Sequence, residues 1–204
     1  MKAWQLFGYN DLRLEDVPLP ELKPGWVLVQ VKVVQPSITE VEIIQGVALA
    51  HQRAVARRLE QKQPVVLGHE FCGRVAEVGA GVTSLKKGDR VTAAAMVHCG
   101  ACPMCQRGLP SRCSNPLYMG AAGGPISGAF SEFICLPERG LVQVPDGPSD
   151  NEVSAFQPLD VCVDSVRLGG VKLGDTVAVI GQGPIGWGCL QLARLAGARL
   201  LIGI

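Results

Sequence analysis

Residues 176–186 read TVAVIGQGPIG. The run TVAVI is typical of a short buried strand, and the spacing G-x-G-x-x-G follows it directly. Apolar residues then recur at helical spacing as far as Gly197, and residues 199–204 begin another strand-like run. Strand, glycine turn, helix and strand together predict one βαβ unit.

The three glycines of this turn suit the phosphates of a dinucleotide. Gly181 permits the tight turn, Gly183 lets the backbone approach a pyrophosphate, and Gly186 lets the helix pack closely on the strand. The start of the helix adds unpaired amides and a positive dipole end. The turn therefore predicts NAD or NADP as cofactor, with a purely structural turn as the alternative. The acid that would separate NAD from NADP is due about 20 residues on, beyond Ile204.

The first 150 residues follow a different pattern. Short strand-like runs alternate with turns rich in Gly, Pro and Asp, which predicts an irregular β-barrel. Residues 48–62 instead form an amphipathic helical pattern with a basic face, which is either a solvated surface or a wall facing an anionic substrate. We expect an α+β chain, with a β-rich domain at residues 1–150 and the start of a βαβ domain at residues 151–204. The strand-like runs cover residues 27–34, 73–78, 90–95, 130–136 and 141–144, and residues 151–168 have a helical pattern.

Four of the eight cysteines lie within fifteen residues, at Cys99, Cys102, Cys105 and Cys113. Thiolates are soft anionic ligands that can complete a tetrahedral shell around zinc. Because all four ligand positions are filled by protein, the spacing predicts a structural zinc site. An iron–sulfur cluster, a disulfide or unliganded thiols are the alternatives.

Composition and charge narrow the function classes. The chain has 19 basic and 18 acidic side chains and a formal net charge of +1, which argues against a nucleic-acid partner. No apolar stretch approaches the roughly 18 residues needed to span a bilayer, and the first twenty residues lack the apolar segment of a signal peptide. We expect a cytoplasmic protein with no membrane partner.

Six motifs follow one another along the chain: GHE at 68–70, GDRV at 88–91, the cysteine group, GAFSEF at 128–133, QPLDV at 157–161 and GQGPIG at 181–186. Their order resembles the zinc-containing medium-chain dehydrogenase/reductase family, which includes alcohol and sorbitol dehydrogenases. The resemblance implies a GroES-like β-rich catalytic domain, then a Rossmann domain that continues beyond residue 204, and a homo-oligomer at full length. It also implies reversible hydride transfer between NAD(P) and a small-molecule secondary or polyol-type alcohol or its carbonyl.

The resemblance also implies a catalytic zinc, and here the sequence departs from the family. His69 matches the histidine ligand, with Glu70 beside it. Ser37 stands where members usually have a cysteine ligand, and Gln157 where they have an acid or cysteine. Two anionic ligands are thus replaced by neutral groups, and we expect the catalytic zinc site to be empty or weakly occupied.

Three further residues are assigned roles by the same resemblance. Thr39 matches a hydroxyl that relays the substrate proton, Glu42 falls where many members pass that proton to solvent, and Glu40 matches an acid behind the metal ligands. A local capping role is the alternative for Thr39 and Glu42. Two other functions stay open: a zinc-independent NAD(P)H reductase that uses Ser37 or Thr39 as hydrogen-bond donor, and a non-catalytic relative with the same fold.

Overall fold

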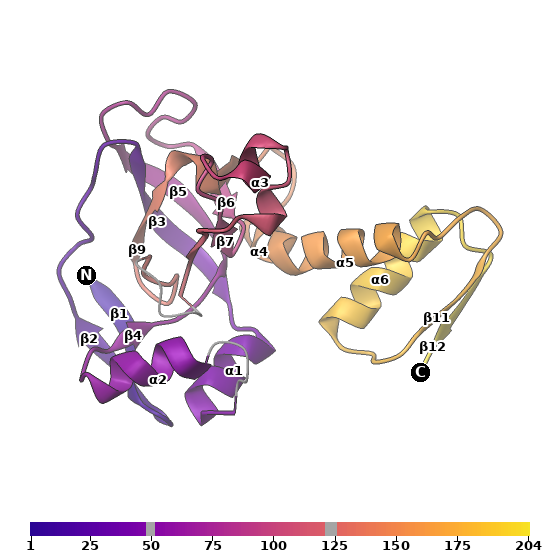
Figure 1. Ribbon diagram of the computed structural model, residues 1–204, viewed down its shortest axis with the longest axis horizontal. Coiled ribbons are helices and arrows are strands. Elements are labelled where there is room, and N and C mark those ends of the chain that lie inside the picture. The colour runs from indigo at the N-terminus through magenta and orange to yellow at the C-terminus, as the bar shows by residue number, and fades with distance from the viewer. Residues whose placement is uncertain (48–51, 121–125) are drawn as a thin grey trace. The chain divides into compact units, whose positions relative to one another are not determined.

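The computed structural model describes residues 1–47, 52–120 and 126–204. It divides the chain into two compact units, Met1–Ser154 and Ala155–Ile204. The first unit is rich in strands and the second consists of helices and a short parallel strand pair (Figure 1).

A five-stranded antiparallel sheet forms the centre of the first unit, in the order β10-β6-β5-β3-β9. The long strand β3 pairs with β5 on one side and β9 on the other. Two register shifts interrupt the ladder between β3 and β5, and such bulges increase the local twist and bend of strands. The five strands are β3 (Trp26–Gln35), β5 (Glu70–Val78), β6 (Arg90–Ala93), β9 (Phe133–Pro137) and β10 (Leu141–Gln143).

A three-stranded sheet and two helices also belong to the first unit. The sheet has the order β2-β1-β4, with β1 at Lys2–Gly8, β2 at Asp11–Asp16 and β4 at Val65–Val66. Helices α1 (Ile38–Gln45) and α2 (Gln52–Glu60) pack against it through a second apolar cluster. The buried members of that cluster are Leu6, Ile43, Val55, Val65 and Leu67.

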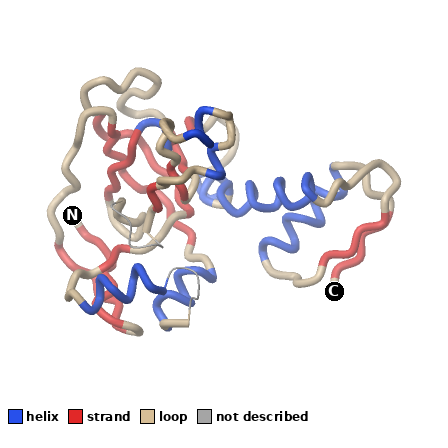
Figure 2. The backbone as a smooth tube through the Cα atoms, in the orientation of Figure 1, coloured by secondary structure: helices blue, strands red, loops and turns tan. Residues whose placement is uncertain are grey.

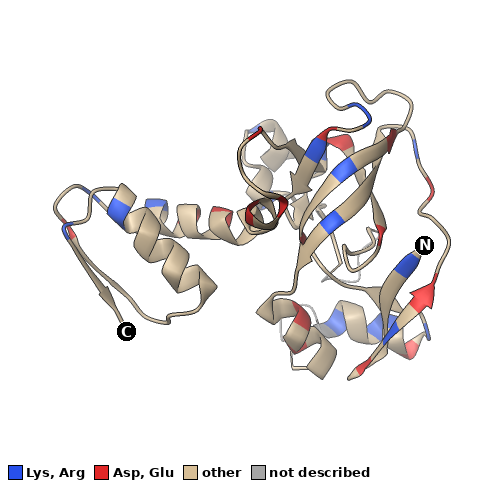
Figure 3. Ribbon diagram, turned by 180° about the vertical axis from the view of Figure 1, so that it is seen from behind, with Lys and Arg blue, Asp and Glu red and all other residues tan. Residues whose placement is uncertain are grey.

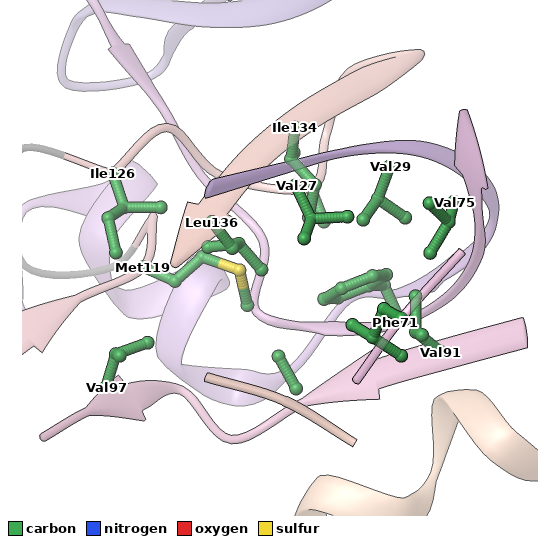
Figure 4. Packing of buried hydrophobic residues seen from close by; sticks show 13 residues of the cluster. Val27, Val29, Phe71, Val75, Val91, Val97, Met119, Ile126, Ile134 and Leu136 are labelled. Carbon is green, nitrogen blue, oxygen red and sulfur yellow. The ribbon is translucent and has the colours of Figure 1, made fainter. Parts of the chain in front are cut away.

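The main core lies against the five-stranded sheet (Figure 4). Val27 and Val29 alternate inward along β3, as the period of two in a strand requires, and both are fully buried. Phe71 of β5 is also fully buried, and Val97 extends the same cluster to a hairpin formed by β7 (Met96–Val97) and β8 (Leu117–Tyr118). The core therefore reaches from the sheet to the base of the cysteine-rich loop.

The second unit contains the predicted βαβ arrangement (Figure 2). Strands β11 (Thr176–Val179) and β12 (Leu200–Gly203) are parallel, and α6 (Pro184–Leu195) connects them. Helix α5 (Phe156–Leu168) packs against α6. The approach is close, because a Cβ added at Gly188 would lie 2.6 Å from Cys162 Sγ. Cys162 is thus a buried packing residue, and burial raises the pKa of its thiol to about 11.

The predicted strands occur, with differences at their ends. The run predicted to begin at Phe130 becomes a strand only at Phe133, because the Phe130 amide donates to the Leu67 carbonyl. The helix predicted at 151–168 is two helices, α4 (Asp150–Ser154) and α5; α4 packs on β3 and β5 within the first unit. Helix α1 and the β1–β2 hairpin were not predicted. A short 3-10 turn, η2 (Glu138–Gly140), connects β9 to β10.

The predicted basic helix is present as α2, although residues 48–51 of the pattern lie outside the described residues. Its Arg53 and Arg57 are exposed, and Arg58 Nη2 donates to the Pro64 carbonyl. Basic and acidic residues are interspersed over the rest of the ribbon (Figure 3). Among the described residues, no helix is both long and apolar enough to cross a membrane.

Candidate functional site

The GHE motif is held in place by its own glycine and by the GAFSEF motif. Gly68 has φ +97°, and a Cβ there would lie 2.6 Å from the Phe130 ring, so only glycine fits without strain. Three consecutive backbone amides of GAFSEF donate to residues 66–68: Gly128 to the Val66 carbonyl, Phe130 to the Leu67 carbonyl and Ala129 to the Gly68 carbonyl. This role of GAFSEF was not predicted from the sequence. The motif fixes the backbone from which His69 emerges.

Ser37 follows β3 and begins α1 as its N-cap. Its Oγ accepts from the Thr39 amide at 3.1 Å, while Glu40 Oε2 accepts from the Ser37 amide at 2.9 Å and from the Ser37 hydroxyl. This reciprocal pattern is a capping box, which satisfies donors that a helix start leaves unpaired. The sequence signal was the S-x-x-E spacing at 37–40, which the sequence analysis did not use.

Glu40 links this cap to His69. Its Oε1 lies 2.6 Å from His69 Nδ1, across 29 residues of sequence, and only 1% of Glu40 is exposed. An ionised carboxylate only accepts hydrogen bonds, so Nδ1 donates. Burial is the largest single influence and opposes both charges, but the hydrogen bonds and the attraction between the opposite charges together outweigh it. The pKa of Glu40 is therefore lowered and the pKa of His69 is raised.

Glu70 approaches the other ring nitrogen. Its Oε1 is 3.8 Å from His69 Nε2, and its Oε2 accepts from Gln35 Nε2 at 2.7 Å. Burial is the main reason that the pKa of Glu70 is raised. The imidazole thus lies between two buried carboxylates that approach different nitrogens. Gln35, at the end of β3, is a partner that the sequence analysis missed.

Thr39, Glu42 and Gln157 are the other residues that were predicted for this site. Thr39 is half-buried in the first turn of α1, and Glu42 is exposed on the same helix. The described contacts join neither side chain to His69. Gln157 is half-buried on α5, which belongs to the second unit, whereas His69 belongs to the first.

The four cysteines of the predicted zinc group converge. All four Sγ atoms lie within 4.8 Å of one another, and the separations from Cys105 are 4.0 Å to Cys99 and 3.5 Å to Cys102. Four sulfurs at about 2.3 Å from one zinc ion would be about 3.8 Å apart. All eight cysteines are free, which contradicts the disulfide alternative. In the part of the chain that the structure describes, this is the only group of three or more His, Cys, Asp or Glu side chains with converging ligand atoms.

Short turns shape this loop. Cys102 is the N-cap of α3 (Pro103–Gln106), and the 3-10 turn η1 (Pro110–Arg112) returns the chain to Cys113. Backbone amides point at the sulfurs, from Cys99 to Cys113 Sγ and from Ser114 to Cys102 Sγ. The amide of Ser114 is the largest of the causes that lower the pKa of Cys102 to about 5. The pKa of Cys99 is also lowered, chiefly by a backbone hydrogen bond, whereas burial is the main cause that raises the pKa of Cys105 to about 12. The loop therefore favours thiolates, the form in which cysteine binds a metal ion, at Cys99 and Cys102 but not at Cys105.

The glycine turn has the geometry expected of an anion cradle. Gly181 has φ +97°, and Gly183 is the extended N-cap of α6 with no atom within 4 Å of an added Cβ. A Cβ at Gly186 would lie 1.8 Å from the Gly181 carbonyl oxygen, so the helix can pack on the turn only through glycine. Packing inside the chain thus accounts for Gly186, whereas Gly183 is open to an approaching group.

Sequence comparison decides the family. The sequence profile of the alcohol dehydrogenase GroES-like domain matches residues 23–146. The chain belongs to this family. The match covers the five-stranded sheet, the His69 centre and the cysteine loop, so the predicted fold class and the resemblance are confirmed.

Relatives of this GroES-like chain extend over both units. It is 36% identical over 203 residues to a protein of Aspergillus clavatus assigned as D-xylulose reductase A, covering 99% of the chain and 54% of that protein. It is 36% identical over 191 residues to L-threonine 3-dehydrogenase of Rhizobium etli, covering 94% of the chain and 52% of that protein. The chain therefore spans about half the length of the curated relatives it matches.

Solved structures agree with this assignment. A protein of Sinorhizobium meliloti 1021 assigned as a zinc-binding dehydrogenase, solved with NADP bound, superposes with a TM-score of 0.83 at 34% identity, over 99% of this chain and 55% of that one. An alcohol dehydrogenase of Thermus sp. ATN1 gives 0.87 at 27% identity, over 100% and 57%. Both likenesses include the βαβ unit.

Proposed function

We propose that this chain is part of an NAD(P)-dependent dehydrogenase that transfers hydride between a secondary or polyol-type alcohol and its carbonyl. The observation that carries the proposal is a buried His69 centre in an alcohol dehydrogenase GroES-like unit, followed in the same chain by a βαβ unit with an open glycine turn. A dinucleotide supplies the hydride chemistry when bound. The chain's own residues hold its phosphates and orient the substrate oxygen.

On the cofactor side, the proposed contacts come from the turn between β11 and α6. Gly181 and Gly183 let the backbone approach a pyrophosphate, and the first amides of α6 face it. Gly186 acts indirectly, by letting the helix pack against the turn. Pro184 at the first helical position removes one amide that has no helical partner and leaves the others directed at the ligand.

On the substrate side, we propose that polar groups around His69 receive the alcohol or carbonyl oxygen. Ser37 and Thr39 carry hydroxyls at the start of α1 that can donate to this oxygen or relay its proton. Glu42 is exposed, which suits transfer of a proton to solvent. Among these groups, Ser37 would have to exchange its hydrogen bond to Glu40 for one to the substrate.

At the four-cysteine loop, the donors fit zinc, and we propose a structural role for it there. Cys99, Cys102, Cys105 and Cys113 would hold the ion through sulfur, which leaves no position open to a substrate. The ion would cross-link a loop that is joined to the core mainly at its two ends, through Val97 and Met119.

The cytoplasmic location and homo-oligomeric state remain predictions.

The test is reduction of NAD and NADP by a panel of secondary alcohols and polyols, using the natural full-length protein. We expect turnover with one of the two cofactors, and a loss of at least roughly tenfold in cofactor affinity for Gly183→Val, since its side chain enters the space of the pyrophosphate. Thr176→Val is the matched control, because Thr176 is exposed at the far end of β11. Binding that is equally strong in Gly183→Val would contradict the proposed cradle.

A second candidate function is a zinc-independent NAD(P)H reductase. The observation that favours it is that Ser37 is committed to the helix cap and Glu40 to His69. Turnover that survives when only the metal of the four-cysteine loop remains would support this reductase over the zinc enzyme. Absence of any turnover with both cofactors would instead support a non-catalytic relative.

A further inference from the structure

We infer that the His69 centre is a hydrogen-bonded side-chain cluster and not a metal centre, so that metal binding in this chain takes place at the four-cysteine loop. The inference rests on the proposed function only in taking the His69 centre as the place where substrate binds. Metal content is measured without turnover, so either proposal can fail alone.

A metal ion at His69 would find too few ligand atoms. Among the described histidine and carboxylate side chains, only His69 Nε2 and Glu70 Oε1, which are 3.8 Å apart, offer ligand atoms on the same side of the imidazole. Glu40 cannot add a third, because its Oε1 is hydrogen-bonded to Nδ1, the other ring nitrogen. Catalytic zinc sites have three protein ligands. One nitrogen and one oxygen do not complete such a site.

Ser37 is the residue at the position of the family's cysteine ligand. Its Oγ accepts from the Thr39 amide and donates to Glu40 Oε2. A metal ion would have to compete with both hydrogen bonds for a hydroxyl that is neutral near pH 7. Breaking them would also open the start of α1, since the same contacts form its capping box.

The charge of a metal ion at this centre would be poorly balanced. The two positive charges of a divalent ion at His69 Nε2 would be balanced only by the single negative charge of Glu70, because the Glu40 carboxylate is hydrogen-bonded to Nδ1. Gln157, at the other family ligand position, has an uncharged amide. The four-cysteine loop offers up to four thiolates in the same chain. A limited supply of zinc or cobalt will therefore enter the loop first.

Hydrogen bonds hold the cluster together in place of a metal ion. Ser37, Glu40 and His69 form a continuous chain of hydrogen bonds from the start of α1 to the start of β5. It fixes the imidazole by its Nδ1 and leaves Nε2 directed toward Glu70. Glu40 is thus a positioning residue that keeps the ring in one orientation without a metal ligand bond.

The experiment measures metal content and cobalt binding of the 204-residue chain. We expect one equivalent of zinc, or of Co²⁺ with the strong sulfur-to-metal absorption of a tetrathiolate, and a second equivalent held at least roughly a hundredfold more weakly. His69→Ala should leave the single equivalent unchanged, and Cys105→Ser should remove it. A second tight equivalent that His69→Ala removes would overturn the inference.

A single substitution within the first unit makes the test sharper. Ser37→Cys replaces the neutral hydroxyl by a side chain that can bind a metal ion as a thiolate, and we expect a second Co²⁺ that binds more tightly than in the natural chain and that disappears when His69→Ala is added. A Ser37→Cys chain whose second Co²⁺ binds no more tightly would overturn the assignment of the deficit to Ser37. If neither the natural chain nor His69→Ala binds metal, the structural zinc of the proposed function fails, and so does the part of the inference that assigns metal binding to the four-cysteine loop.

Discussion

The cysteine loop and the His69 centre are two polar clusters in one GroES-like unit, and they are built in opposite ways. The loop gathers four chemically identical side chains within one short stretch, and its sulfurs converge without help from distant strands. The His69 centre joins residues from the end of β3, the start of α1 and the start of β5. A ligand set that is complete within one stretch of chain can thus be recognised from its spacing, whereas the hydrogen bonds that hold His69 join residues from three elements.

The largest effect should follow from breaking the cysteine loop. Cys102→Ser, or removal of metal by a strong chelator, is expected to release residues 99–118, because metal binding contributes on the order of 10 kcal/mol at such sites. Hydrogen exchange should rise in this loop while the five-stranded sheet stays protected. Cys189→Ser, in the second unit, is the control. Unchanged protection of the loop after metal removal would show that it is ordered without an ion.

The second largest effect concerns the acid that orders the His69 centre. Glu40→Ala should lower the free energy of unfolding by about 3–5 kcal/mol, because it leaves a buried imidazole unpaired and opens the cap of α1. Glu40→Gln retains an oxygen that can accept from Nδ1, so its loss should be smaller. Urea unfolding of both variants checks this order. Equal losses would mean that the carboxylate charge, and not the hydrogen bond, holds the ring.

The third prediction separates backbone strain from contact at the GHE motif. Gly68→Ala should cost about 2 kcal/mol, since it combines a positive φ with a clash against the Phe130 ring. Gly88→Ala is a matched control: its φ is +94° and an added Cβ meets nothing within 4 Å. The difference in urea midpoints measures the contact alone. If the two variants unfold together, Phe130 moves aside freely and does not fix His69.

The same contrast explains what could be predicted from sequence. The convergence of the four cysteines and the strand, turn and helix around the glycines could be predicted because spacing over a few residues determines them. Zinc at the cysteines and a dinucleotide at the glycines stay predictions. The partnership of GAFSEF with the backbone before His69 was missed, because it joins segments about 60 residues apart through main-chain hydrogen bonds that no side-chain pattern records. That pairing also delayed the start of β9 to Phe133.

Other misses have local causes. Helix α1 has few residues and a weak apolar pattern, and the resemblance drew attention to Ser37 and Thr39 as catalytic groups and away from their capping spacing. The helical pattern at 151–168 does not show its division at Ala155, because α4 is held by contacts with β3 and β5 that lie far away in sequence. Tertiary packing decided both boundaries.

The smallest effect should come from Ser37 itself. If this hydroxyl is a cap and not a metal ligand, Ser37→Ala removes one side-chain acceptor for the Thr39 amide and one donor to Glu40. Loss of such a cap typically costs about 1 kcal/mol, and the metal content should stay the same. Glu42→Gln is the control on the same helix, and it should change stability by less than about 0.5 kcal/mol because Glu42 is exposed. Thermal unfolding measures the stability of each variant, and metal analysis of the same samples measures its metal content. A Ser37→Ala chain that keeps its stability but loses metal would reverse the assignment, since it would make the hydroxyl a ligand and the cap incidental.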